Sequence, residues 1–346
     1  MNYSLKKYTL PIQLQKEEKI LTLNFIDINF SEEIVFITNQ GNIYRFHLKS
    51  EVQELIFNCR DLLDLESGIK IYSYKNYVAF VNTISTKGFM FNLLDNSLHL
   101  SLERGDYHVE HCSFPIAFYS RKDEVFLIHG TDWNRLDITS LSDKKLMTDR
   151  IVAYHKENPV NYFDYFHSLL CISPDEKHFI SNGWVWSPYD LLMMWQIEDF
   201  LTEYELKYQN LSDLDTSGYN WDRPLCWIDE KTIAYGYNAL ESGEDDLSED
   251  TPTEIIIQNI HNNEILERIA FEGFYLNDYK EVKGTLIFDQ NKAIFIAFSF
   301  EKGITIIDKK GSLVYKNEHI FPDIYAGAYA SFLSTDGIQT NLFQLT

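Results

Sequence analysis

Long hydrophobic runs are missing from this chain of 346 residues. Because no run of 18 apolar residues occurs, we expect no transmembrane helix. The N-terminal segment 1–16, MNYSLKKYTLPIQLQK, also lacks the apolar stretch of a secretory signal peptide. The sequence therefore predicts a cytoplasmic protein without a membrane partner.

Cysteine is also scarce, and the four residues Cys59, Cys112, Cys171 and Cys226 stand far apart. The last two lie in the apolar runs LLCIS and PLCWI. Such a setting is typical of cysteines that act as small buried hydrophobic residues in a reducing compartment.

Positive charge is in deficit, with 30 Lys and Arg against 52 Asp and Glu and a formal net charge of -22. A field of this sign repels phosphate backbones and anionic membrane surfaces, so no nucleic-acid partner is expected. A basic protein or a cation is an electrostatically easier partner. The simpler interpretation is that the acidity only confers solubility.

Recognisable catalytic motifs are absent as well. The sequence contains no GxSxG elbow, phosphate-binding loop, dinucleotide fingerprint or HExxH pair. We therefore assign no catalytic residue and predict no cofactor. Sites assembled from scattered residues would leave no such motif, so an enzyme stays an alternative.

Aromatic residues, by contrast, are abundant, with 22 Tyr, 24 Phe and 6 Trp, and they favour β-strands. An apolar run, a turn and an alternating run, the signature of a β-hairpin, recur seven times, or about once per 49 residues. Four of the hairpins have a turn that ends in glycine, at Gly41, Gly88, Gly303 and Gly337. The other three, with longer turns, lie within 125–138, 178–197 and 232–260.

Further strand-like segments flank these hairpins, which gives about four strands per repeat. Seven such repeats predict an all-β, seven-bladed β-propeller that occupies residues 1–346 as a single domain, with six blades as the alternative. The last hairpin has no outer strand after it, so we predict that segment 3–10 closes the last blade. Segments 61–67 and 196–204 could each form a short helix, and the protein is expected to be a monomer.

Several strings carry a family resemblance. SPDEKHFIS (173–181) is similar to the inner hairpin turn of WD repeats, and MWQIED (194–199) to a degenerate third strand. TDWNRLDI, GWVWSP and WDRPLCWID resemble segments of a bacterial propeller group without an established activity. The chain thus resembles the WD-repeat and related bacterial propellers over nearly its whole length, although the Gly-His and Trp-Asp pairs of the full repeat are missing. The resemblance implies the fold and no activity.

The repeat also predicts where a binding site lies. When the strands of a blade are called a to d from the centre outward, the b–c turns and d–a connections emerge on one face. On this face blades 3 to 5 carry the long segments, and long loops often carry function. They are expected at 129–132, 150–166, 182–190, 210–223 and 237–253.

These segments combine aromatic residues with a few carboxylates and an arginine, a mixture that suits a polar ligand or a peptide. The candidate binding residues are Trp133, Asp164, Tyr165, His167, Trp184, Trp186, Tyr189, Trp221, Asp222 and Arg223. The alternative is that the aromatic side chains form small cores under the long loops.

Two pairs within this set allow a sharper interpretation. Asp164 could orient His167 for acid–base work, although a structural hydrogen-bond network is the alternative. Asp222 and Arg223 form either a local ion pair in a turn or a receptor for a carboxylate or phosphate.

Signals for a metal site are weak. Asp213, Asp215 and Ser217 match the opening of a calcium loop, but Pro224 stands where the loop needs a glutamate, so an Asx-rich turn is the alternative. Residues 108–112, His-Val-Glu-His-Cys, could hold zinc only with a further ligand from elsewhere; otherwise they are a polar connection. No metal is predicted.

The leading functional hypothesis is a protein-interaction module that binds a protein or peptide through the face of blades 3 to 5. The acidic run 241–250 is either a solvated loop or a docking strip for a basic partner. The alternatives are a hydrolase or lyase that uses Asp164, His167, Asp222 and Arg223, an acidic neutraliser of a basic toxin, and a purely structural propeller.

Overall fold

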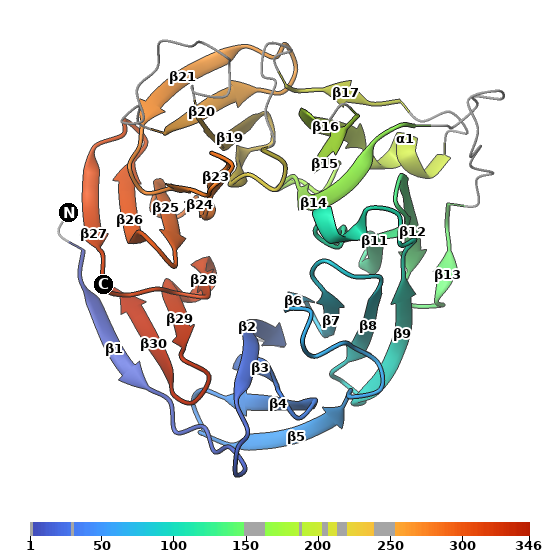
Figure 1. Cartoon of the computed structure of the whole chain (residues 1–346), viewed down its shortest axis with the longest axis vertical. Coiled ribbons are helices and arrows are strands. Elements are labelled where there is room, and N and C mark those ends of the chain that lie inside the picture. The colour runs from blue at the N-terminus through green and yellow to red at the C-terminus, as the bar shows by residue number, and fades with distance from the viewer. Residues whose placement is uncertain are drawn as a thin grey trace. The chain divides into compact units, whose positions relative to one another are not determined.

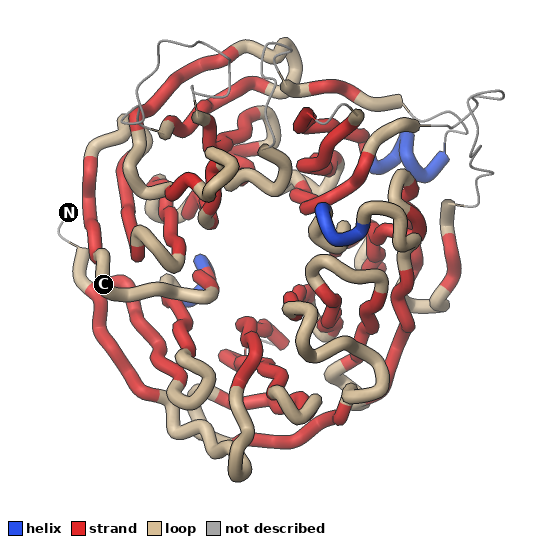
Figure 2. Tube along the Cα trace, in the orientation of Figure 1, coloured by secondary structure: helices blue, strands red, loops and turns tan. Residues whose placement is uncertain are grey.

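A computed structural model describes residues 3–28, 31–148, 163–186, 189–202, 207–212, 220–238 and 253–346. In these ranges strands far outweigh helices (Figure 2). No helix in the same ranges is long and apolar enough to cross a membrane. The chain divides into two compact units, one of residues 1–110 with 320–346 and the other of residues 111–319.

The described strands form seven four-stranded antiparallel sheets and one small two-stranded sheet. This set of sheets confirms the predicted fold class, an all-β seven-bladed β-propeller. We number the blades along the chain, so that blades 1, 2 and 7 belong to the first unit and blades 3 to 6 to the second.

In the first unit, blade 1 contains β2 (Ile20–Ile28), β3 (Ser31–Thr38), β4 (Asn42–His47) and β5 (Gln53–Asn58). Blade 2 contains β6 (Ile69–Tyr74), β7 (Tyr77–Asn82), β8 (Lys87–Asn92) and β9 (Ser97–Glu103). Blade 7 contains β28 (Ile324–Ala326), β29 (Ser331–Thr335), β30 (Thr340–Leu345) and, as its outer strand, β1 (Leu5–Thr9).

The pairing of β1 with β30 confirms the predicted closure of the last blade. The two strands are antiparallel, from Leu5 opposite Leu345 to Thr9 opposite Asn341, and they lie side by side in Figure 1. The backbone bonds from Ser4 N to Thr346 O (2.9 Å) and from Thr346 N to Ser4 O (3.0 Å) extend the ladder to the last residue. Segment 4–9 and the last residue, Thr346, are therefore held by the sheet rather than frayed.

In the second unit, blade 3 contains β10 (Ile116–Arg121), β11 (Glu124–Asp132), β12 (Arg135–Ser140) and β13 (Lys145–Leu146). Blade 4 contains β14 (Phe166–Ile172), β15 (His178–Val185), β16 (Tyr189–Gln196) and β17 (Gln209–Asn210). Blade 5 contains β18 (Leu225–Asp229), β19 (Thr232–Tyr237), β20 (Glu254–Asn259) and β21 (Ile265–Ala270). The small sheet of β22 (Tyr275–Leu276) and β23 (Val282–Lys283) precedes blade 6, which contains β24 (Thr285–Asp289), β25 (Ile294–Ser299), β26 (Gly303–Asp308) and β27 (Leu313–Asn317).

The core of the second unit lies between successive blades. One buried cluster joins Ile180 and Met194 of blade 4 to Ile233 and Ile256 of blade 5. A sheet covered on both faces buries the residues of its middle strands, which explains why β25 is apolar from Ile294 to Phe298 and buried throughout. The outer strands, such as β21, are mostly exposed and carry charged residues.

The strands of blades 3 and 4 are longer than the sequence suggested. β11 extends to Asp132, so the expected loop 129–132 is strand and the turn to β12 is only Trp133–Asn134. In blade 4 the ladder continues to Val185 opposite Tyr189, so most of the expected loop 182–190 is also strand. In blade 3 a register shift between Gly130 and Asp132 lets the pairing continue past a glycine and a polar residue.

The two helix predictions had different outcomes. Helix α1 (Ile197–Thr202) lies within the predicted range 196–204. The helix predicted at 61–67 is wrong, because this segment forms turns. The Asp64 carboxylate accepts bonds from the Glu66 amide (3.0 Å) and the Ser67 hydroxyl, and such local bonds compete with a helix. The other described helices are the 3-10 turns η1 (Val109–His111) and η3 (Gly327–Tyr329).

Candidate functional site

Four aromatic residues stack in a layer at one end of the strands of blade 4. Phe166 and Trp184 lie face to face, with ring centroids 3.8 Å apart and planes 4° apart. Trp133 packs on Phe166 (4.5 Å), and Trp221 packs on Trp184 (5.3 Å). We call Trp133, Phe166, Trp184 and Trp221 the aromatic layer; it brings together residues from the turn of blade 3, two strands of blade 4 and the connection to blade 5.

Two indole N–H groups of the layer donate hydrogen bonds to neighbouring residues. Trp184 Nε1 donates to the Sγ of buried Cys112 (3.0 Å), and Trp221 Nε1 donates to the His111 carbonyl (2.6 Å). Only 2% of the Trp184 surface is exposed. The packing alternative therefore describes Trp184 well, since its ring is covered on both sides.

Trp186 and Tyr189 differ from the layer because they are exposed, Trp186 by 46%. The Trp186 ring stands edge-on against Trp184, at 5.0 Å and 87°, and against Phe166, at 5.8 Å and 89°. Tyr189 begins β16 opposite Val185, at the same end of the blade. Both side chains therefore expose aromatic surface to solvent, and Trp186 is supported by the buried rings of Trp184 and Phe166.

A β-bulge lies next to Phe166 and Trp184 in the ladder between β14 and β15. Phe166 pairs with Trp184 and Leu169 with Asn182, so two residues of β14 face Gly183 alone. The Gly183 amide donates to the hydroxyl of fully buried Tyr165 (2.7 Å), and this hydroxyl donates toward the Ser181 and Leu191 carbonyls. Tyr165 is therefore a structural residue, and burial raises the pKa of its phenol.

His167 is also structural. It is 4% exposed, its Nδ1 lies 3.2 Å from the Ser181 hydroxyl, and burial lowers its pKa to about 3. Half-buried Asp164 makes no ion pair with it in the described structure, so the contacts of His167 fit the alternative of a structural hydrogen-bond network rather than an Asp–His pair.

The depressed pKa of His167 predicts a dependence of stability on pH. The unfolded chain takes up a proton below about pH 6.5 and the folded chain does not, so this contribution is complete above pH 6.5 and is lost as the pH falls toward 3. We expect His167→Gln to reduce the slope of unfolding free energy against pH by about 1 kcal/mol per pH unit in that window. Urea unfolding at several pH values measures the slope; equal slopes in the two proteins would contradict the assignment.

Asp222 and Arg223 are neighbours with separate partners. The Asp222 carboxylate accepts bonds from the Leu169 amide (3.0 Å) and the Ser113 amide (3.2 Å). Arg223, 4% exposed, forms a buried ion pair with Asp190 and also donates to the Asn220 carbonyl (3.2 Å). The local Asp222–Arg223 ion pair is therefore absent from the described contacts, and the Arg223 guanidinium is already occupied by Asp190.

The structure thus divides the ten predicted residues. It groups Trp133, Trp184, Trp186 and Trp221 in contact around Phe166. In the described structure the polar residues of the enzyme alternative, Asp164, His167, Asp222 and Arg223, make no hydrogen bond to one another. The calcium candidates Asp213, Asp215 and Ser217 and the acidic run 241–250 lie outside the described residues.

Sequence reasoning missed a polar pocket of about 400 Å³ at the opposite end of β15. It lies between the end of β10, the turn 173–177 and the start of α1. Glu176 accepts bonds from the Ser120 amide and hydroxyl, and Arg121 pairs with Glu198 at 2.7 Å. The charged turn Asp175-Glu176-Lys177 was the only signal for it, and these residue types are common in exposed turns.

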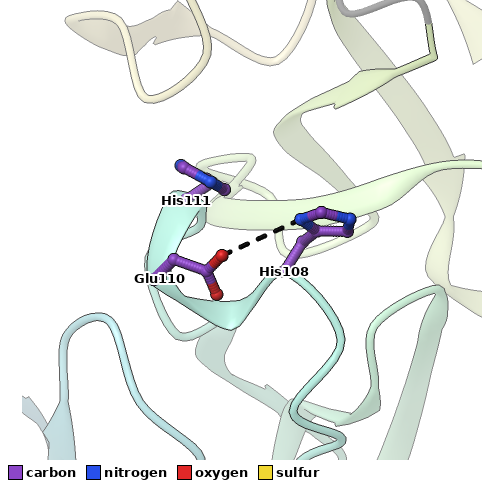
Figure 3. A group of neighbouring side chains, drawn as sticks. All are labelled: His108, Glu110 and His111. Atoms are coloured by element: carbon purple, nitrogen blue, oxygen red, sulfur yellow. Dashed lines mark ion pairs between the residues drawn. The ribbon is translucent and has the colours of Figure 1, made fainter.

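One group of potential metal ligands occurs among the described residues. His108, Glu110 and His111 place one ligand atom each within 4.8 Å of one another, and Figure 3 shows Glu110 directed at His108. Cys112, the fifth residue of the same sequence motif, takes no part because it is buried against Trp184.

Fold and site together define a seven-bladed β-propeller with an exposed aromatic pair on a stacked layer over blade 4. No protein-family model matches the sequence, and no curated protein matches it either.

Proposed function

We propose that this propeller is a binding module that recognises a protein or peptide through Trp186 and Tyr189. The observation that carries the proposal is the seating of Trp186. It combines 46% exposure with edge-on contacts to two buried rings, Trp184 and Phe166. A side chain held in this way loses little entropy when a partner covers it, which is the property of an interface anchor.

We further propose that the partner is basic. The net charge of -22 favours encounter with a positively charged surface and disfavours nucleic acid. Binding to such a partner weakens as salt rises. A basic toxin is one partner of this chemistry, so the neutraliser hypothesis is a special case of the same proposal.

The WD-repeat-like assignment is part of the proposal as well. It is supported by the turn after β14, where the Ser173 hydroxyl accepts bonds from the Lys177 amide (3.2 Å) and the His178 amide (2.9 Å). This turn joins the two inner strands of blade 4, which is the position that the resemblance implies for SPDEKHFIS.

Trp186→Ala tests the binding surface. We expect the variant to capture its partner from a cell extract at least about tenfold less well than wild type, because a buttressed tryptophan supplies a large share of interface energy. Unfolding free energy is expected to change by less than about 0.5 kcal/mol, because the side chain is half exposed. Quantitative mass spectrometry of the captured proteins, followed by titration of the purified partner at two salt concentrations, measures the effect.

Phe300→Ala is the matched control. Phe300 is 68% exposed, follows β25 in blade 6 and packs on Tyr275 (4.8 Å). Loss of an exposed aromatic residue there should leave capture unchanged. Equal binding by wild type and Trp186→Ala would refute the proposed surface.

A further inference from the structure

The turn that ends at η1 presents two imidazoles and a carboxylate from four consecutive residues. His108, Glu110 and His111 come from one continuous segment, and their ligand atoms all lie within 4.8 Å of one another (Figure 3). His108 Nδ1 is 3.8 Å from Glu110 Oε1. Glu110 and His111 are exposed and His108 is half-buried, so an ion from solvent can reach all three side chains.

The backbone of this turn is fixed at several points. Arg104, only 4% exposed, donates to the Val109 carbonyl (3.3 Å), and Trp221 donates to the His111 carbonyl (2.6 Å). The Val109 amide donates to the Asp106 carbonyl (3.4 Å). His108 itself has a left-handed backbone with φ of 54° and packs edge-on against Tyr107, with ring centroids 4.5 Å apart. The backbone that carries the three side chains is therefore held in place.

We propose that His108, Glu110 and His111 bind one divalent transition-metal ion of the zinc class. Two neutral imidazoles and a carboxylate match the ligand preference of zinc, whereas calcium and magnesium take oxygen ligands. Zinc holds such ligands at about 2.0–2.2 Å, so the side chains must close further around the ion. Rotation of exposed side chains on a fixed turn achieves this closure, and the carboxylate exchanges its contact with His108 for the metal.

Among the described residues the site has three protein ligands, which leaves a position that a solvent molecule can fill. Cys112 is excluded as the fourth ligand because its sulfur accepts the Trp184 N–H inside the core. Three protein ligands with an open position are typical of zinc sites that exchange a ligand, unlike closed structural sites with four. The open position can accept an oxygen or nitrogen ligand from solvent.

Titration of the full-length chain, prepared without a polyhistidine tag, tests the site. We expect isothermal titration calorimetry with Zn²⁺ to show one ion per chain, and His111→Ala to weaken binding at least about tenfold. Glu110→Gln should also weaken it, because the charge is lost while the size is kept. His261→Ala, which removes an exposed histidine from the turn between β20 and β21, should titrate as wild type does.

A second measurement separates this site from adventitious binding. Zn²⁺ binds the folded turn, so it should raise the unfolding temperature of wild type and of His261→Ala but not that of His111→Ala. Co²⁺ should give an absorption spectrum of a four-coordinate site in the same two proteins only. Unsaturable binding, or equal binding by wild type and His111→Ala, would overturn the proposal. Trp186 takes no part in the metal site. A negative result in the zinc experiments would therefore not contradict the proposed partner surface.

Discussion

Gly183→Ala is expected to lower the free energy of unfolding by about 3 kcal/mol, as overpacking against a rigid backbone does. A Cβ atom at this position would lie 2.0 Å from the Phe166 carbonyl oxygen and 2.8 Å from the Tyr165 ring. The first neighbour is backbone and the second is a fully buried phenol with three hydrogen-bond contacts. Neither can move away without opening the bulge between β14 and β15.

The same substitution should also disturb the packing of the aromatic layer. Phe166 and Trp184 are the partners next to Gly183 in the ladder, so separation of the strands disturbs their stacking. Gly327→Ala is the matched control, because a Cβ atom there meets only Tyr325, at an ordinary 3.8 Å. Urea unfolding followed by tryptophan fluorescence measures both variants. Similar unfolding midpoints for the two would contradict the close approach.

The fold was predictable because each repeat produces a local sequence pattern of strands and turns. Alternating apolar residues and glycine turns, as at Gly41 and Gly303, mark hairpins, and both glycines have positive φ. Segment 3–10 was recognisable as the missing outer strand because the last hairpin lacked one. β17 and β28 were not predicted, since strands of two and three residues carry too little periodicity to detect.

Local patterns fail where tertiary pairing decides the structure. The ladder of blade 4 continues through Trp184 to Val185 opposite Tyr189, although the lack of a short glycine turn in this hairpin suggested a long loop at 182–190. The bulge opposite Gly183 needs contacts between two strands, so a single-sequence pattern cannot reveal it. The segment 61–67 has helical spacing, but Asp64 bonds to its own turn instead.

In the candidate site, too, some features were predictable from the sequence and others depend on tertiary structure. The rule that alternate turns share one face correctly placed Trp133, Trp184 and Trp221 together. It could not separate Trp184 from Trp186, which are two residues apart, because their exposure depends on where β15 ends and on what covers it. Nor could it identify Asp190 as the partner of Arg223, since the two are distant in sequence.

Arg223→Met should destabilise the protein by about 3–5 kcal/mol, the cost of leaving one member of a buried ion pair alone. Asp190 is 1% exposed, and Arg223 also donates to the Asn220 carbonyl and lies over the Tyr235 ring at 5.6 Å. Removal of the guanidinium leaves the Asp190 carboxylate with the Asn220 amide (3.3 Å) as its one other hydrogen-bond donor in the described structure. Chemical unfolding at neutral pH measures the loss.

The double variant Asp190→Leu with Arg223→Met decides whether charge burial is the cause. If the cost comes from the stranded carboxylate, replacing both groups by apolar ones restores most of the stability, because the desolvation penalty disappears with the pair. Glu198→Gln supplies the exposed comparison. Its pair with Arg121 is about half exposed on both sides, so its loss should cost less than about 1 kcal/mol. A double variant no more stable than Arg223→Met would show instead that the guanidinium matters for its packing on Tyr235 and its bond to Asn220, because those contacts are missing from both proteins.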